Sequence, residues 1–335
     1  MTTDPKYIVT HLSPDFDAIS SSYLLKKAYP NAKVIFVHNG ASSNKKNSIH
    51  TDTGGKDYDH HHLYGMLSST FLVYNDKKII ERLPSFIKKN PLLGKFVNSV
   101  NLWDNAAFRM LDKDGKDIIS KKGRGHVFKL MWGCCLMHHG SNRRESSSRL
   151  RYCFDLLDRM FMSSNDELIV KEGNGYDENA ASAYDDFYRK NLSIIKSGKP
   201  FIAGKRKGIY FKNLPIGYNP LFILFHFDAF IFKKNYKSIS GAAVRLSLTL
   251  ENAYQSLKEE IVKKGLLGNY PGKKGADGEV ILVGGDRIIL FDPNSQSRLK
   301  NFGDRRRRIS VNNKKFMKNM VNTKLFFEMI KKSLS

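Results

Sequence analysis

The N-terminal part of the chain alternates strand-like and helix-like runs, and this alternation constrains the fold more than any other feature. β-Branched and aromatic residues favour strands at Tyr7–Thr10, Lys33–His38 and Ser48–Thr51. Apolar spacing favours helices at Ala18–Ala28 and Ser68–Arg82. Alternating strands and helices form a parallel sheet, which binds ligands beyond the carboxyl ends of its strands. The sequence therefore predicts an α/β fold with a parallel-sheet N-terminal domain and a ligand site at that edge.

The chain is long enough for more than one lobe, because single cores usually stop growing before 335 residues. We predict an N-terminal domain over residues 1–124, a helical connector over 125–179 and a smaller α+β C-terminal domain over 180–335. The connector has helical patterns at Val127–Leu136 and Arg149–Met162, separated by a polar loop, Gly140–Ser147. The predicted C-terminal elements are a basic exposed segment at Gly198–Lys207, strands at Gly208–Lys212, Leu221–Phe232 and Ala242–Leu250, a helix at Glu251–Lys264 and a hairpin at Val280–Phe291 that turns at Gly284-Gly285.

The chain is strongly basic. Its 56 lysines and arginines outnumber 32 aspartates and glutamates, which gives a formal net charge of +24. Such a surface concentrates polyanions, so we expect nucleic acid, an oligonucleotide or another polyanionic phosphate as substrate. A generally basic proteome or a solubilising surface is the alternative. A basic tail, Arg305–Arg308 with Lys314, Lys315 and Lys318, is either a solvated face or a phosphate-contacting patch.

The cysteines and the lengths of the apolar runs indicate where in the cell the protein is expected. Cys134, Cys135 and Cys153 form no Cys-x-x-Cys motif, which argues against a disulfide framework or a cysteine zinc site. No apolar run reaches the ~18 residues of a membrane span. We therefore expect a cytoplasmic protein with no membrane partner. The sequence leaves the oligomeric state open, a dimer included.

Three potential metal ligands crowd the loop after the first predicted strand, in THLSPDFDAISSS. Asp15 and Asp17 would repel each other unless a cation lay between them. His11 adds an imidazole ligand suited to manganese, iron, cobalt or zinc. Capping of the next helix by Asp15 is the alternative, but capping explains only one of the three residues.

A second cluster follows the third predicted strand, in HTDTGGKDYDHHH. Asp52 ends the strand, and Gly54 and Gly55 permit a sharp turn. Further carboxylate and imidazole ligands follow at Asp59, His60, His61 and His62. A fortuitous polar tract or a histidine-rich metal store is the alternative. A third piece, NLWDNAAF, places Asp104 after an apolar stretch, where by itself it would be interpreted as a helix cap.

From His11 to Asp104, these motifs resemble those of the DHH phosphoesterase superfamily in their order. HLSPDFDAISS resembles the first motif, Asp52 the second, Asp59-His60-His61 the namesake third and Asp104 the fourth. The resemblance implies that His11 and Asp15 bind one metal ion, that Asp17, His60 and Asp104 bind a second, and that Asp52 bridges them. It also implies that His61 contacts the substrate phosphate and that Asp59 supports the histidines from outside the coordination sphere.

Within that superfamily, TDTGGKDYDHHH and LSSTFLVYNDKKII are similar to the MYG exonuclease family, which implies RNA cleavage. The first motif follows the general superfamily pattern instead. Eight positions separate Asp52 from His60, fewer than is usual, so the chain must turn tightly at Gly54-Gly55. This spacing leaves open an exchange of roles between His61 and His62.

The resemblance and the charge together predict a DHH-type, manganese-dependent phosphodiesterase or exonuclease that degrades single-stranded nucleic acid or oligonucleotides. Two cations roughly 3.5–4 Å apart lower the pKa of a shared water and offset charge on phosphoryl oxygens. Mn²⁺ suits oxygen and imidazole ligands, with Mg²⁺ or Co²⁺ as substitutes. A pyrophosphatase, exopolyphosphatase or cyclic-dinucleotide phosphodiesterase is a rival among hydrolases. A non-catalytic nucleic-acid-binding protein is a rival from another class.

Two C-terminal segments, VRLSLT and YPGKKGADG, resemble the substrate-binding domain that follows the catalytic domain in DHH enzymes, without its usual histidine. The resemblance implies that Arg245, Lys273 and Lys274 bind substrate phosphates, Arg through a planar fork and Lys as a point charge. An ordinary strand followed by a surface turn is the alternative.

Overall fold

The computed structural model divides the chain into two compact units, Met1–Tyr188 and Arg189–Ser335, with the boundary inside helix α8 (Tyr176–Lys196). The structure describes residues 4–61, 67–104, 122–140, 142–170, 175–212, 214, 218–234, 239–244, 280–283, 286–290 and 308–312. Residues 125–179, predicted as a helical connector, are grouped by their contacts with the first unit.

The first unit contains a three-stranded parallel sheet. Its strands are β1 (Tyr7–His11), β2 (Lys33–Val37) and β3 (Ser48–His50), in the order β2-β1-β3. Tyr7 of β1 lies opposite Lys33 of β2 on one side and opposite Ser48 of β3 on the other. The predicted α/β class with a parallel N-terminal sheet is confirmed. Because the strands are parallel, their carboxyl ends lie at one edge.

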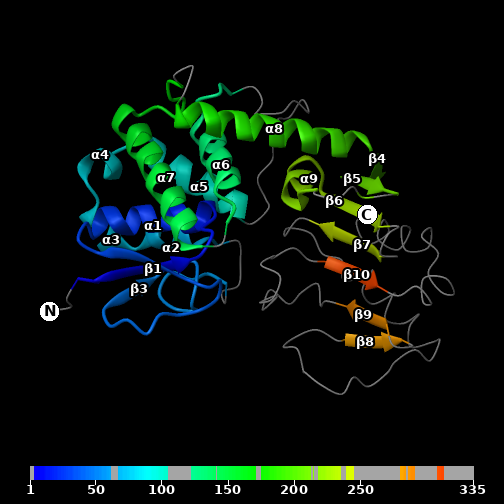
Figure 1. Ribbon diagram of the computed structural model, residues 1–335, viewed down its shortest axis with the longest axis horizontal. Coiled ribbons are helices and arrows are strands. Elements are labelled where there is room, and N and C mark those ends of the chain that lie inside the picture. The colour runs from blue at the N-terminus through cyan, green and yellow to red at the C-terminus, as the bar shows by residue number, and fades with distance from the viewer. Residues whose placement is uncertain are drawn as a thin grey trace. The chain divides into compact units, whose positions relative to one another are not determined.

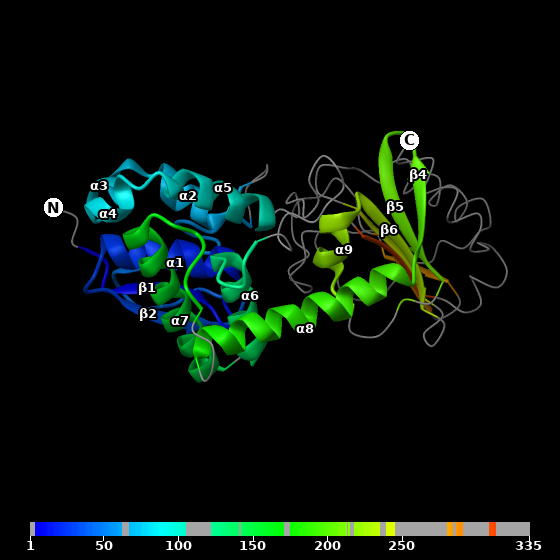
Figure 2. The ribbon, with the colours of Figure 1, turned by 90° about the horizontal axis from the view of Figure 1, so that it is seen from above.

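Helix α1 (Phe16–Ala28) packs on β1 and is the most enclosed helix of this unit. Asp15 caps it by accepting hydrogen bonds from the backbone N–H groups of Asp17 and Ala18. Eleven of its thirteen residues are buried, because other helices pack around it. The helices that contact it include α2 (Ser69–Asn75), α3 (Lys77–Arg82), α5 (Leu92–Asp104) and α7 (Arg143–Ser163) (Figures 1 and 2).

The segment Ser68–Arg82, predicted as one helix, forms two helices, so that prediction was wrong. Asp76 leaves the helical region, with φ −82° and ψ 106°, and its side chain accepts a hydrogen bond from the Lys78 N–H to start α3. A short carboxylate that competes for backbone N–H groups ends one helix and begins the next. A one-turn helix, α4 (Ser85–Lys88), follows.

Two further helices precede the part of α8 that belongs to the first unit. Helix α6 (Val127–Met137) matches the predicted Val127–Leu136 within one residue. Helix α7 begins at Arg143, six residues before its predicted start, because the Asn142 side chain accepts a hydrogen bond from the Glu145 N–H and caps it. The predicted polar loop Gly140–Ser147 is therefore helical from Arg143 onward.

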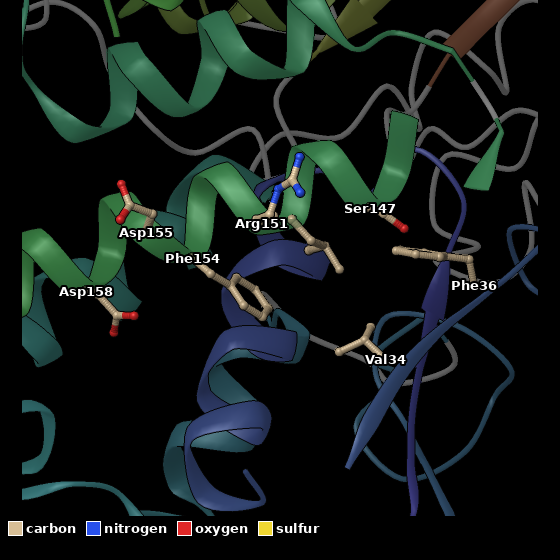
Figure 3. A pocket seen from close by; sticks show the side chains of 8 residues that line it. Val34, Phe36, Ser147, Arg151, Phe154, Asp155 and Asp158 are labelled. Atoms are coloured by element: carbon tan, nitrogen blue, oxygen red, sulfur yellow. The ribbon is translucent and has the colours of Figure 1, made fainter. Parts of the chain in front are cut away.

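A hollow of about 440 Å³ opens between the edge strand β2 and helix α7. Figure 3 shows Val34 and Phe36 of β2 and Phe154 of α7 around it, with Asp155 and Asp158 farther along the helix. None of the six residues predicted to bind metal lines this hollow.

The second unit contains a seven-stranded mixed sheet in the order β4-β5-β6-β7-β10-β9-β8, in which β5 and β6 pair in parallel and the other neighbours pair antiparallel. The strands are β4 (Lys199–Ala203), β5 (Arg206–Phe211), β6 (Ala229–Lys234), β7 (Ile239–Val244), β8 (Val280–Val283), β9 (Asp286–Leu290) and β10 (Arg308–Asn312). The predicted hairpin over Val280–Phe291 is confirmed as β8 and β9. The predicted helix Glu251–Lys264 lies outside the described residues.

The run Leu221–Phe232, predicted as one buried strand, is a helix followed by a strand, so that prediction was wrong. Helix α9 (Pro220–His226) begins with Pro220 in its first turn and with the Asn219 side chain as its cap. Strand β6 begins three residues after α9 ends. A continuously apolar run has no period that separates a buried helix from a buried strand. Ile223, Leu224 and Phe230 do lie in the core of this unit, as an apolar run predicts.

In the part of the chain that the structure describes, no helix combines the length and the apolar character needed to cross a membrane.

Candidate metal centre

Carboxylates and imidazoles meet at the carboxyl edge of the parallel sheet. His11 is the last residue of β1, Asp52 lies two residues beyond β3, and Asp104 is the last residue of α5. The six residues predicted to bind metal fall into two groups, and within each group one ligand atom per residue lies within 4.8 Å of the others. One group is His11, Asp15 and Asp52; the other is Asp17, His60 and Asp104.

A tight loop after β3 holds Asp52 in position. Asp52 has a left-handed φ of 54°, and Gly54 and Gly55 follow with φ of 85° and 66°. A Cβ atom at Gly54 would lie 3.0 Å from His50 Cδ2 and 3.2 Å from the Ala41 carbonyl oxygen, so a larger residue does not fit. The predicted sharp turn at Gly54-Gly55 is confirmed. Because of this turn, the chain comes back toward Asp52 although only eight positions separate Asp52 from His60.

In the first group, His11 and Asp52 are in direct contact. His11 Nε2 lies 3.2 Å from Asp52 Oδ2, and His11 Nδ1 lies 2.8 Å from the Leu12 carbonyl oxygen, to which an Nδ1–H donates. Burial lowers the pKa of His11, but the hydrogen bond and charge of Asp52 outweigh burial and raise it to about 9. Asp15 Oδ1 caps α1, so the predicted alternative of a helix cap is confirmed for a residue that also belongs to this group.

In the second group, the start of α2 fixes a buried carboxylate. Asp17 Oδ2 and Oδ1 each accept a hydrogen bond of 2.7 Å, from the N–H groups of Ser69 and Thr70. His60 Nδ1 lies 3.3 Å from Asp17 Oδ2, and His60 Nε2 lies 3.4 Å from Asp104 Oδ2. Ser69 Oγ also lies 2.8 Å from His60 Nδ1, so one helix N-terminus orients both Asp17 and His60.

Asp52 joins the two groups. Its Oδ2 faces His11, and its Oδ1 lies 3.5 Å from His60 Nδ1. Among the described residues, Asp52 Oδ1 and His60 Nε2 have no hydrogen-bond partner, although both are buried. Burial raises the pKa of Asp17 to about 6 and also raises that of Asp52. Burial and then the charges of Asp17 and Asp52 raise the pKa of Asp104 well above its ordinary value. Such a surplus of buried acceptors fits divalent cations, which carry the opposite charge.

Asp59 and His61 belong to a further group of possible ligands, which they form with Asp52 and His60, and His61 Nδ1 lies 3.6 Å from Asp52 Oδ1. Asp59 Oδ1 lies 2.5 Å from His61 Nδ1 and accepts the His61 N–H at 3.1 Å, and Asp59 Oδ2 accepts the Gly55 N–H at 2.6 Å. Although burial opposes the shift, the hydrogen bond to His61 lowers the pKa of Asp59 to about 2. The His61 side chain is 44% exposed and stacks on the His60 ring at 4.5 Å. Asp59 therefore orients His61, whose ring is open to solvent.

Four residues predicted to bind substrate lie outside the described residues: His62, Arg245, Lys273 and Lys274. Of the predicted basic tail, Arg308 begins β10, and the remaining members also lie outside the described residues.

Sequence reasoning missed the residues that brace the first ligand loop. Buried Arg149 donates from Nη1 to the Pro14 carbonyl oxygen at 2.7 Å and from Nη2 to the Cys135 carbonyl oxygen at 3.2 Å. The Ser13 N–H donates to Ser146 Oγ at 3.0 Å. A signal was present, because Arg149 is spaced four residues from buried Cys153 and thus shares its helix face.

Comparisons with known proteins give no family. No protein-family model matches the chain, and no curated protein matches it. Among solved structures, it is similar to an uncharacterized protein from Helicobacter pylori G27 at 12% sequence identity, over 76% of this chain and 89% of that chain, with a TM-score of 0.17. A TM-score this low carries no inference about fold or function.

Proposed function

We propose that this chain is a metal-dependent phosphohydrolase of the DHH type that cleaves phosphodiester bonds in single-stranded nucleic acid or oligonucleotides. The observation that carries the proposal is Asp52, whose two oxygens face the two ligand groups. A carboxylate in this position suits a pair of neighbouring cations. The parallel sheet with its ligand loops at the carboxyl edge supports a DHH-type architecture for the first unit.

The donor set favours Mn²⁺, with Mg²⁺ or Co²⁺ as substitutes, because it contains only carboxylate oxygens and imidazole nitrogens. When bound, two such ions supply a water of lowered pKa and offset negative charge on the phosphoryl oxygens. His11, Asp15 and Asp52 would hold one ion, and Asp17, His60 and Asp104 the other.

The remaining task of the chain is to receive the phosphate, and we assign this task to His61. Burial lowers the pKa of His61, but the hydrogen bond to Asp59 and the charge of Asp52 raise it to about 9. A half-exposed imidazole whose Nδ1 is held by a carboxylate donates a hydrogen bond from its other ring nitrogen to a phosphate oxygen. Asp59 acts through His61 by holding its Nδ1, which leaves Nε2–H for the substrate.

The substrate class is inferred from charge. A net charge of +24 favours a chain of phosphates over a small phosphate ester, because each added phosphate adds attraction. The test incubates the Mn²⁺-loaded chain with short oligonucleotides, pyrophosphate, polyphosphate and cyclic dinucleotides. We expect mononucleotides from the oligonucleotides. Phosphate from pyrophosphate without any mononucleotide release would favour the phosphoanhydride rival, and binding without turnover would favour the non-catalytic rival.

A further inference from the structure

A polar pocket of about 410 Å³ adjoins the loop between Asp52 and Asp59. The segment Ser43–Ser48 lines one part of it, and His50, Lys56 and Asp57 line the rest. It differs from the hollow between β2 and α7 because hydroxyl, amide and ammonium groups replace the valine, leucine and phenylalanine side chains found there.

The pocket carries uncompensated positive charge. Lys45, Lys46 and Lys56 are exposed at its rim. Within the part of the chain that the structure describes, none of these three forms an ion pair, and Lys45 Nζ lies 5.6 Å from the centre of the Tyr7 ring. The one carboxylate of the pocket, Asp57, accepts the His50 N–H at 2.8 Å and also contacts the His50 ring. Although the Asp57 side chain is 41% exposed, three lysines face this one carboxylate, so the pocket keeps a net positive charge.

Internal hydrogen bonds hold the lysine-bearing wall in shape. Ser43 Oγ accepts the Lys45 N–H at 3.2 Å, and Ser48 Oγ donates to the Lys45 carbonyl oxygen at 2.7 Å. The Ser43 N–H donates to His50 Nε2 at 3.0 Å, which ties this wall to β3. The pocket is thus formed before a ligand arrives, which reduces the ordering cost of binding.

The pocket is connected to the metal centre through one short loop. The Lys56 carbonyl oxygen accepts the Asp59 N–H at 2.8 Å, and Asp59 in turn orients His61. A ligand that spans several phosphates could contact Lys56 while another of its phosphates meets His61. A small phosphate ester could occupy only one of these positions.

We propose that this pocket binds a backbone phosphate of a single-stranded oligonucleotide, beside the phosphodiester that the metal centre cleaves. The proposal rests on the proposed function and names the substrate class of that site. Lysines among neutral polar groups bind phosphates without reading sequence. The oligonucleotide, rather than inorganic polyphosphate, is the source of this phosphate because it is the substrate of the proposed function, and the competition experiment below distinguishes the two.

The test measures binding of a short fluorescein-labelled oligouridylate to the full chain by fluorescence anisotropy, with a chelator present so that no hydrolysis is needed. The double variant Lys46→Gln/Lys56→Gln is compared with Lys77→Gln/Lys78→Gln, which removes the same charge from exposed positions of α3. We expect the pocket variant to bind about tenfold more weakly, with a salt-dependence slope reduced by about 0.7, as for the loss of one phosphate contact, whereas the control binds like the unmodified chain.

Two results would overturn the proposal while leaving the proposed function standing. Equal weakening in both double variants would mean that only total charge matters, and no weakening in the pocket variant would exclude the pocket. Competition by inorganic tripolyphosphate as strong as that by unlabelled oligouridylate, at equal phosphate concentration, would remove the oligonucleotide assignment. If the unmodified chain does not hydrolyse oligonucleotides with Mn²⁺, while the pocket variant still binds oligouridylate more weakly than the control variant, only the proposed function is contradicted.

Discussion

The two ends of the loop from His50 to His60 each carry a buried histidine, and their surroundings differ. At the start, both ring nitrogens of His50 have partners, Asp57 at 3.3 Å and the Ser43 N–H at 3.0 Å. At the end, carboxylate oxygens of Asp17, Asp52 and Asp104 lie within 3.5 Å of the His60 ring nitrogens. A buried histidine with two hydrogen bonds positions a loop, whereas one among several carboxylates is suited to a cation.

The largest effect should come from the carboxylate shared by the two ligand groups. Asp52→Asn keeps the shape of the side chain but removes its charge, and we expect Mn²⁺-dependent hydrolysis to fall by about a thousandfold or more. Asp155→Asn is the control, because it makes the same change at a carboxylate that pairs with Arg159 on α7 and belongs neither to the ligand groups nor to the lysine pocket. Turnover that survives in the Asp52 variant would mean that the two groups do not work together.

The difference between His50 and His60 can be tested by replacing each histidine in turn with glutamine. We expect His60→Gln to weaken Mn²⁺ binding by about a hundredfold, measured by calorimetry. His50→Gln should change that affinity by less than about tenfold while lowering the free energy of unfolding by about 1–3 kcal/mol, because buried partners lose hydrogen bonds. If His50→Gln weakened Mn²⁺ binding and His60→Gln did not, the metal would bind near His50, and the account would be wrong.

A smaller effect should appear in the pH dependence of stability without metal. The pKa of Asp17 is raised to about 6 and that of His11 to about 9, so the folded chain binds more protons than the unfolded chain across this range. The melting temperature of the metal-free chain should therefore fall as pH rises from about 5 to about 9. Mn²⁺ displaces these protons, so its stabilising effect should grow over the same range. A metal-free melting temperature that rises with pH would contradict this account of the site.

The sequence predicted which of these carboxylates and imidazoles lie close together better than it predicted the helix boundaries. The end of a strand can be predicted from the local sequence, and parallel pairing brings the carboxyl ends of neighbouring strands to one edge. His11, at the end of β1, and Asp52, just beyond β3, could therefore be placed together. The start of α7 depends on the Asn142 cap. The polar residues around Asn142 were instead interpreted as a loop. The spacing of Arg149 from Cys153 indicated a shared helix face, but the bracing role of Arg149 could not be predicted, because its partners are carbonyl groups distant in sequence, such as that of Pro14.

The most direct measurement is an anomalous difference map from crystals of the chain soaked in Mn²⁺. The account predicts two peaks about 3.5–4 Å apart. One should lie against His11 and Asp15, the other against Asp17, His60 and Asp104, with Asp52 in contact with both. A single peak, or peaks bound only at the exposed ring of His61, would contradict it.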